Sequence, residues 1–426
     1  MSTEVFAQGQ DIAEEMFDVV AESRRRGRTV VDDPYPLWAE HRQRGSVHPG
    51  FAVELLGLRP TEALFEVKRP HYAVLGFDDC HRALVNNDIF SSSFYDEFLP
   101  SKAFGRTILH MGGEEHRRYR NIVQPHFIRQ QATAWWQGAW IEPIVAELIA
   151  MIENQKSVDL SKTLCARLPM HTITRAFGMA DERAIEFRYN LLRNMSSEDP
   201  EERAASDTYI RRVLQEEIEA RKARPRDDLI SVLLHSEFKD ADGDPARLDE
   251  EEIYSFCRVV MTAGGGTTFR QLGITLVALL SDPEQLEAVR RDRSLIERAI
   301  HESLRWNTTL PIFHRLVTED TDLGGVLIPE GSVVDLCLGA ANRDPARWEA
   351  PECYDLHRPV QRHLGFAGGP HTCLGMFVAQ GEMTVAINAL LDRFPSLRFD
   401  PDFAAPAISG SPELRGVSHL NVRLDG

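Results

Sequence analysis

A glycine-rich stretch from Gly365 to Gly375 leads to a single cysteine, Cys373, and then into a long helical pattern. A thiol where a tight loop meets a helix start is surrounded by backbone N–H donors and the positive end of the helix dipole, and both favour the thiolate. A thiolate binds iron, and the glycines let a flat cofactor approach the backbone while Phe366 covers one side of the sulfur. The alternative is a buried structural cysteine beside an ordinary turn, which is the more frequent situation for an isolated cysteine. Cys373 is therefore the best candidate metal ligand, and the rest of the sequence has to decide between the two interpretations.

The chain of 426 residues has no linker rich in proline, glycine or serine, no low-complexity block and no internal repeat, so we expect one domain over residues 1–426. Hydrophobic residues make up 43% and charged residues 27%, which fits a soluble globular protein with a core large enough to enclose a ligand. The six cysteines are scattered without a C-x-x-C pair. Neither a disulfide framework nor a zinc site is expected, and the compartment is expected to be reducing.

Residues 1–20 lack the basic and apolar regions of a signal peptide, and no apolar run approaches the ~20 residues needed to cross a bilayer. We therefore expect a cytoplasmic protein that does not act at a membrane. The formal net charge of −17 argues against nucleic acid or an anionic membrane surface as the main partner.

Long amphipathic helical patterns dominate the chain, and short β-like runs occur at residues 72–75, 333–336 and 420–422. Helices are predicted to begin at Asp282-Pro283 and to cover residues 296–306. The pattern predicts a mainly α fold with a minor β region.

The cysteine stretch resembles the ligand loop of the cytochrome P-450 superfamily, whose pattern is Phe-Gly-x-Gly-x-His-x-Cys-x-Gly. The matching residues are Phe366, Gly369, His371, Cys373 and Gly375. Ala367 stands where the family usually has its first glycine, so the turn is expected to differ a little in shape. Loop phrases such as 34–36, 90–92 and 341–345 are similar to the same family, and the resemblance covers nearly the whole chain. It implies the cytochrome P-450 fold, with haem b (iron protoporphyrin IX) between a long distal helix and the proximal cysteine loop and helix.

Glu302 and Arg305 lie three residues apart on a predicted helix, so they can pair on one face. By itself such a pair is usually an exposed ion pair of little energetic value. In this place it resembles the family's Glu-x-x-Arg motif, which forms a network with an arginine that Arg358 matches here. The implied role is structural: the network locks the cysteine loop and retains haem.

Haem carries two propionates, which favour arginine forks and histidine donors. His116 and Arg120 resemble the family's His-x-x-x-Arg, Arg315 matches another propionate arginine, and His371 precedes the cysteine by two positions. Any one of these is more simply a solvated side chain. Their agreement across three segments favours propionate binding.

Residues 250–281 form a long helical pattern that Ala263 to Thr268 are expected to break, because each interior glycine costs roughly 1 kcal/mol relative to alanine. Close approach by a cofactor or ligand would compensate, and the alternatives are a loop between two helices or a site of close helix packing. The segment resembles the family's distal helix, in which a threonine and an adjacent acid manage protons during oxygen activation. Thr267, followed by Thr268, matches the threonine, but Gly266 occupies the place of the acid. We expect water, or a carboxylate from another segment, to replace it.

The resemblance implies a monooxygenase that oxidises a small, largely apolar organic substrate with dioxygen. No nucleotide-binding fingerprint or flavin segment is recognisable. Electrons are therefore expected from a separate protein. The resemblance implies that this partner is a ferredoxin or flavodoxin with an NAD(P)H-dependent reductase, which an arginine patch could meet if the patch is more than a solvated helix face. The patch comprises Arg117, Arg118 and Arg129. By family analogy the substrate pocket is lined by Ala263, Leu310, Ile312 and Phe313, and capped by segments 94–108 and 187–197.

Two alternatives remain open at this point. The missing acid also suits a haem-thiolate enzyme that uses peroxide or catalyses a rearrangement, although Thr267 argues against it. The other alternative is a haem-binding sensor or carrier without catalysis, which the full set of matching residues disfavours.

Overall fold

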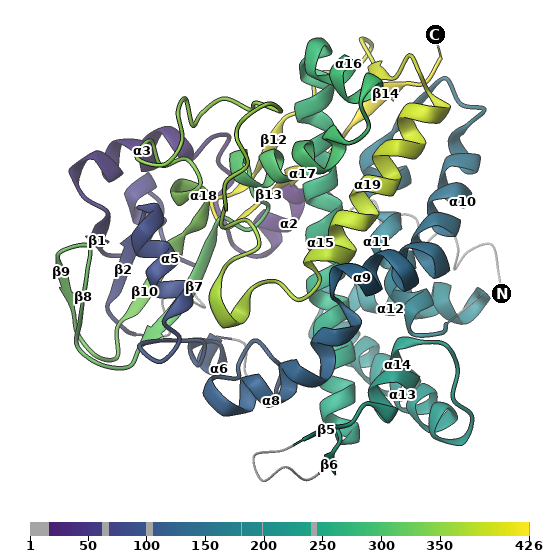
Figure 1. Cartoon of the computed structure of the whole chain (residues 1–426), viewed down its shortest axis with the longest axis horizontal. Helices are drawn as coiled ribbons and strands as arrows, with labels where there is room; N and C mark the ends of the chain where they lie inside the picture. Colours follow the sequence, from purple (N-terminus) through teal and green to yellow (C-terminus); the bar gives the residue numbers. More distant parts are fainter. Residues whose placement is uncertain are drawn as a thin grey trace.

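The computed structural model describes residues 17–61, 68–98, 105–179, 181–197, 199–239 and 245–425 (Figure 1). The α-helices are α2 (Val19–Arg25), α3 (Tyr35–Arg44), α5 (Phe77–Val85), α6 (Phe94–Phe98), α8 (Gly113–Val123), α9 (Arg129–Gln131), α10 (Glu142–Ile152), α11 (Arg167–Ala176), α12 (Asp181–Ser196), α13 (Pro200–Ala223), α14 (Leu229–His235), α15 (Glu250–Ser281), α16 (Pro283–Arg291), α17 (Leu295–Trp306), α18 (Leu338–Ala341) and α19 (Met376–Arg393). Segments η3 (Ala132–Ile141) and η4 (Ser161–Cys165) are π-helical, and η1 (Glu54–Leu56), η2 (Gln124–His126) and η5 (Gly369–His371) are 3₁₀ turns.

The strands are β1 (Val47–Pro49), β2 (His71–Val74), β3 (Phe90–Ser91), β4 (Ser157–Asp159), β5 (Phe238–Lys239), β6 (Pro245–Ala246), β7 (Ile312–Val317), β8 (Thr321–Leu323), β9 (Val326–Ile328), β10 (Val333–Cys337), β11 (Arg398–Phe399), β12 (Ile408–Ser411), β13 (Leu414–Val417) and β14 (Asn421–Arg423). The largest sheet has the order β1-β2-β10-β7-β3, with β2 and β10 parallel and β10 and β7 antiparallel. The three predicted β-like runs correspond to β2, β10 and β14. The predicted mainly α fold with a minor β region is confirmed, and Figure 1 shows the sheet on one side of the helices.

The long helix α15 is continuous from Glu250 to Ser281, so the predicted interruption at residues 263–268 is wrong. A capping box between Asp249 and Glu252 fixes its start. A Cβ on Gly264 would lie 3.1 Å from the side chain of Ile173 on α11, and one on Gly265 would lie 2.7 Å from the sulfur of Met170. The backbones of α11 and α15 therefore approach closely, and this packing offsets the poor helix propensity of glycine.

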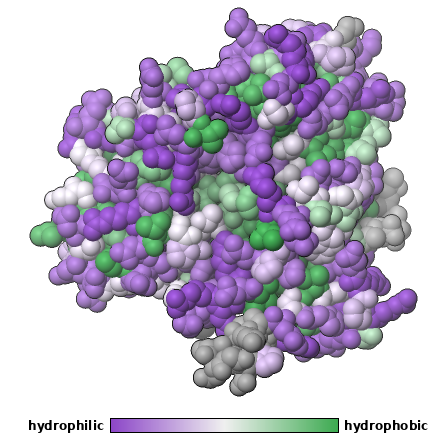
Figure 2. Space-filling view, in the orientation of Figure 1, coloured by the Kyte–Doolittle hydropathy of each residue, from purple (hydrophilic) through white to green (hydrophobic). Residues whose placement is uncertain are grey.

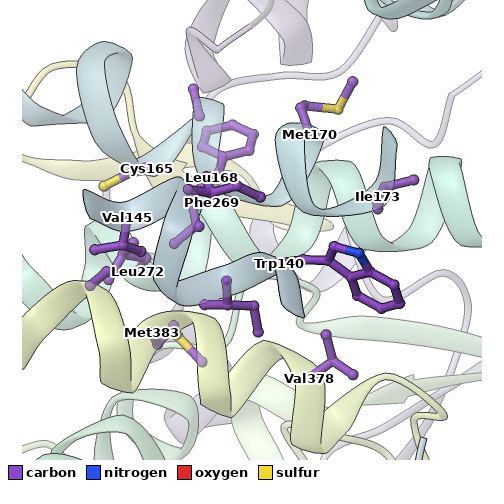
Figure 3. Packing of buried hydrophobic residues seen from close by; sticks show 14 of the residues in the cluster. Trp140, Val145, Cys165, Leu168, Met170, Ile173, Phe269, Leu272, Val378 and Met383 are labelled. Atoms are coloured by element: carbon purple, nitrogen blue, oxygen red, sulfur yellow. The ribbon is translucent and has the colours of Figure 1, made fainter. Parts of the chain in front are cut away.

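The main hydrophobic core lies where α10, α11, α15 and α19 come together. Figure 3 shows Trp140, Leu168, Phe269 and Met383 pointing into it from different elements. The same cluster of buried residues extends from Phe17 to Leu424. Helix α15 runs through this core and is buried over most of its length, which makes it a rigid support for any site beside it.

Hydrophilic side chains cover most of the face seen in Figure 2, with apolar residues in patches between them. Among the helices of the described ranges, none combines the length and apolarity that a membrane span requires.

Candidate active site

Cys373 lies in the loop between η5 and α19, and its backbone N–H donates to the carbonyl of Phe366 at 3.0 Å. A cavity of about 470 Å³ lies between this loop, α8 and the start of α19, and Cys373 is one of the residues that line it. Burial raises the pKa of the Cys373 thiol, while the N–H of Gly375 and the charge of Arg120 act in the opposite direction. Burial therefore outweighs the helix-start effect in the polypeptide alone, and a coordinated cation would supply the remaining stabilisation of the thiolate.

The turn before the cysteine uses two left-handed residues. Ala367 has φ of 56° and Gly369 has φ of 65°. A Cβ on Gly369 would lie 2.3 Å from the carbonyl oxygen of Leu84, so only glycine fits there. Ala367 keeps a backbone conformation that costs an L-residue roughly 1–2 kcal/mol. The turn is thus formed although alanine replaces the first glycine of the pattern.

Four cationic or imidazole side chains converge beside this loop: His116, Arg120, Arg315 and His371. The His116 and His371 rings lie 4.1 Å apart between centroids, and Arg120 donates to the carbonyl of Thr372 at 2.6 Å. Burial lowers the pKa of His116 to about 4 and that of His371 to about 2, and the charges of Arg120 and Arg315 act in the same direction.

Two buried polar atoms of this group lack a hydrogen-bond partner among the described residues, Nε2 of His116 and Nε of Arg315. Arg315 donates through Nη1 to the carbonyl of His314 at 2.8 Å, and His371 Nε2 lies 2.9 Å from the hydroxyl of Ser92. Buried polar groups are normally paired, so these atoms and the positive potential around them suit an anionic ligand.

Glu302, Arg305 and Arg358 form one hydrogen-bonded network. The carboxylate of Glu302 accepts from Arg305 at 2.7 and 2.8 Å and from Arg358 at 3.0 Å. Arg305 also donates to the carbonyls of Pro351 and Cys353 at 2.8 and 2.9 Å. The structure therefore brings together the three residues that the sequence grouped, and ties α17 to the segment that precedes the cysteine loop.

In the distal segment of α15, the hydroxyl of Thr267 donates to the carbonyl of Ala263 at 2.8 Å. The carbonyl of Gly266 accepts from the guanidinium of Arg270, which is buried and also pairs with Glu22 of α2. A Cβ on Gly266 would lie 3.0 Å from Nη1 of Arg270. An arginine thus occupies the space beside the position where the pattern has an acid.

The model of the family described as cytochrome P450 matches residues 185–402. The 6-deoxyerythronolide B hydroxylase of Saccharopolyspora erythraea is 34% identical over 313 residues, which cover 73% of this chain and 76% of that protein. The chain belongs to the cytochrome P450 family.

Solved structures agree with this assignment. Cytochrome P450 CYP109Q5 from Chondromyces apiculatus has a TM-score of 0.80 and 27% identity, covering 92% of this chain and 96% of that one. CYP109E1 from Bacillus megaterium, in complex with testosterone, has a TM-score of 0.78 and 25% identity, covering 92% and 100%. The chain is therefore an oxidoreductase that incorporates molecular oxygen, and the cofactor of cytochrome P450 proteins is haem b.

The donor set fits haem b. Cys373 provides a thiol at the lining of the cavity, and the His116–Arg120–Arg315–His371 group provides unpartnered donors that suit carboxylates. The expected pocket residues lie on two separate segments and do not line the cavity at Cys373: Ala263 is exposed on α15, and Ile312 is buried at the start of β7 beside the half-buried Leu310 and Phe313. Two segments of this cytochrome P450 were predicted to cap the pocket. In the first, 94–108, residues 99–104 lie outside the described residues. The second, 187–197, falls in and just after α12.

The three arginines predicted to meet a redox partner are engaged with carboxylates. Arg117 lies 2.6 Å from Glu114, Arg118 lies 2.7 Å from Glu252, and Arg129 lies 2.8 Å from Glu297. Arg117 also lines the cavity at Cys373. They are local ion pairs rather than a bare positive patch.

Sequence reasoning missed Glu382 on α19. This side chain is 3% exposed, hydrogen-bonds to Thr172 and Thr268, and burial raises its pKa to about 8. A carboxyl with that pKa is protonated at neutral pH. The only signal in the sequence was a charged residue within an otherwise apolar helical pattern.

Proposed function

We propose that this cytochrome P450 hydroxylates or otherwise oxidises a small, largely apolar organic compound, with electrons from a separate redox partner and the whole chain acting as one domain. The observation that carries the proposal is Cys373 at the lining of a cavity, beside a group of arginines and histidines with unpartnered donors. The relatives support the substrate class: one is named a hydroxylase of 6-deoxyerythronolide B, and one was solved with testosterone. The core cluster that extends from Phe17 to Leu424 supports a single domain.

Each part of the site has a distinct role in this proposal. Cys373 would hold the iron of haem b through its sulfur, and the bound haem would supply the redox chemistry for the oxidation. His116, Arg120, Arg315 and His371 hold its propionates, Phe366 covers the sulfur and Gly375 donates an N–H to it. The Glu302–Arg305–Arg358 network fixes the segment before the loop. Ala263, Leu310, Ile312 and Phe313 exclude water from the substrate.

Protons reach the distal side through Glu382 in this proposal. The Glu382 carboxyl is protonated at neutral pH and hydrogen-bonds to Thr268, which is adjacent to Thr267 in α15. Its proton passes to the Thr268 hydroxyl and on to water beside Thr267, whose own hydroxyl orders that water. Glu382 is thus the carboxylate from another segment that replaces the acid absent at Gly266.

Electrons come from a ferredoxin or flavodoxin that an NAD(P)H-dependent reductase reduces. Docking beside the cavity at Cys373 gives the shortest path to the sulfur, and exposed Arg117 and Arg129 exchange their present carboxylates for those of an acidic partner. Formation of product with a ferredoxin or flavodoxin system, and its decline as the salt concentration rises, tests this part.

The decisive experiment is the ferric absorption spectrum of the haem-loaded protein, titrated with terpenoids, steroids, fatty acids and aromatic compounds. A low-spin to high-spin shift with one class identifies ligands that enter the distal pocket and supplies substrates for turnover. Cys373→Ala is expected to lose the thiolate-haem signature, and Cys353→Ala, at another exposed cysteine, is expected to keep it. An unchanged spectrum for Cys373→Ala contradicts the assignment.

A second candidate is a peroxide-using or rearranging haem-thiolate enzyme, which Gly266 in the place of the acid favours. Turnover supported by hydrogen peroxide that exceeds turnover with a ferredoxin or flavodoxin system would select it over the first candidate.

A further inference from the structure

A chain of polar contacts joins the protein surface to the backbone of the cysteine loop. Arg129 on α9 lies 2.8 Å from Glu297 on α17, and Glu297 lies 4.0 Å from Nε2 of His301, one turn further along α17. His301 Nδ1 lies 2.9 Å from His363 Nε2, and the backbone N–H of Gly365 donates to His363 Nδ1 at 3.0 Å. These contacts lead from an exposed ion pair to the residue that precedes Phe366.

The tautomers of both imidazoles follow from one backbone donor. The N–H of Gly365 can only donate, so His363 Nδ1 accepts and the proton of neutral His363 resides on Nε2. That N–H donates to His301 Nδ1, so the proton of neutral His301 resides on Nε2. Nε2 of the Gln380 amide on α19 lies 3.1 Å from this nitrogen, so the amide must turn by half a rotation before its oxygen can accept from His301.

This chain is complete only while His301 is neutral. A proton on His301 Nδ1 would face the N–H of His363, and moving the His363 proton to its other nitrogen would face the N–H of Gly365. In either case a hydrogen bond next to the cysteine loop is lost. Burial lowers the pKa of both imidazoles, that of His363 to about 3, so the neutral chain is the resting arrangement.

The charge on His301 depends on the surface pair. The negative charge of Glu297 raises the pKa of His301, and the positive charge of Arg129 lowers it. His363 and the uncharged amide of Gln380 face it from the other two packed segments. His301 is 34% exposed, so water can deliver a proton to it. Removal of Arg129 from Glu297 would therefore favour the imidazolium.

Arg129 also lies at the edge of the cysteine site. Its guanidinium packs 5.0 Å from the ring centroid of Phe377, which lines the cavity at Cys373. An acidic protein that docks over this cavity can take Arg129 away from Glu297.

We propose that His301 is a positioning residue for the cysteine loop, and that Glu297 and Arg129 couple its protonation to the docking of an acidic redox partner. The inference rests on the proposed delivery of electrons beside Cys373. His301 takes its proton from water as the partner supplies one electron, so both charges are accounted for. A positive charge on His301 favours the reduced protein, and reduction in turn favours protonation of His301, because the linkage is reciprocal.

The test is the midpoint potential of the haem-loaded protein as a function of pH, measured with chemical reductants and without partner or substrate. In the wild type the potential is expected to rise as the pH falls through a step below about pH 6.5, the ordinary pKa of histidine, because burial lowers the pKa of His301. His301→Gln keeps a hydrogen-bonding side chain that cannot titrate in this range, and should abolish the step. A wild-type potential that does not change with pH, or a step that survives in His301→Gln, would overturn the proposal.

Two surface variants decide the matter if His301→Gln fails to bind haem. Arg129→Ala removes a positive neighbour and should move the step to higher pH, whereas Glu297→Gln removes the negative one and should move it to lower pH. Arg44→Ala is the matched control, because Arg44 is an exposed partner of Glu40 on α3 and should leave the step in place. Shifts of equal sign in Arg129→Ala and Glu297→Gln contradict the coupling. The ferric spectrum distinguishes failure of the coupling from failure of the proposed function. A protein without a thiolate-haem signature contradicts the proposed function itself, whereas a normal signature without the expected shifts contradicts only the coupling.

Discussion

Two regions of the molecule differ in how closely they follow the family pattern. One is the cysteine loop with its supporting network, and the other is the distal segment of α15. On the cysteine side, Glu302 accepts hydrogen bonds on both oxygens from groups that the pattern names. In the distal segment, Gly266 replaces the acid and Arg270 occupies the adjacent space. Under the proposed function, the difference means that haem binding depends on one fixed geometry, whereas proton delivery depends only on a buried carboxyl within hydrogen-bonding reach of the threonines.

Replacement of Cys373 by alanine should have the largest effect, because the sulfur is the only protein ligand proposed for the iron. Monooxygenase turnover and the thiolate-haem spectrum are both expected to disappear. Measurement of the ferrous carbon monoxide spectrum checks this. Retention of the normal spectrum would mean that another residue binds the iron. The cysteine side could then no longer be said to follow the family pattern.

Arg305→Leu should destabilise the folded protein by about 3–5 kcal/mol, because it leaves Glu302 buried without its main partner. Chemical denaturation of the haem-loaded protein, together with the rate of haem loss, measures the effect. Arg117→Leu at an exposed pair is the control and should cost about 0–1 kcal/mol. Equal losses in the two variants would mean that the network does not support the cysteine loop.

Glu382→Gln tests the distal side through pH. The pKa of Glu382 is raised from 4.5 to about 8 in the folded protein, so the native state holds a proton that the unfolded state has lost in this window. Stability should therefore fall as pH rises from 4.5 to about 8, with a slope of up to about 1.4 kcal/mol per pH unit from this group. Denaturation at several pH values should show a smaller slope in Glu382→Gln.

The same variant should divert reducing equivalents from product to peroxide, because its amide cannot supply a carboxyl proton. A ratio of peroxide to product equal to that of the wild type would exclude Glu382 from proton delivery.

Gly266→Asp should have the smallest effect. The new carboxylate would lie beside Arg270 and pair with it, so we expect a change in coupling of about tenfold or less. Oxygen consumed per product formed is the measurement. If coupling and oxygen activation stay unchanged, the absence of the acid has no mechanistic weight, and the distal segment differs from the family pattern in sequence alone.

Short motifs allowed much of the cysteine side to be predicted. Glu302 and Arg305 share a helix face at any helical register, and the loop pattern placed Arg358 and Cys373 relative to them. The geometry was therefore implied by spacing together with the family resemblance. Ala367 shows the limit of such matching, because its left-handed conformation is imposed by the surrounding turn and not by alanine's own preference.

The distal side was less predictable because tertiary packing overrides local propensity. Three glycines argued for a break in the helix, yet close contact with Ile173 and Met170 keeps α15 continuous, and those neighbours are distant in sequence. Glu382 and His301 were missed for a related reason. Acidic and imidazole side chains in helical patterns usually face solvent, and only the packing of α19 and α17 shows that Glu382 is buried and that His301 is partly covered by His363 and Gln380.

The hairpin of β12 and β13 packs on α15, where Val417 meets Gly273 and Gly416 meets Arg270. During synthesis α15 leaves the ribosome well before this hairpin exists, so the apolar surface that the hairpin covers stays exposed to water for as long as the intervening segments take to be made. Completion of the core around α15 must wait for this hairpin. The nascent chain therefore has an interval in which chaperones and aggregation compete for it.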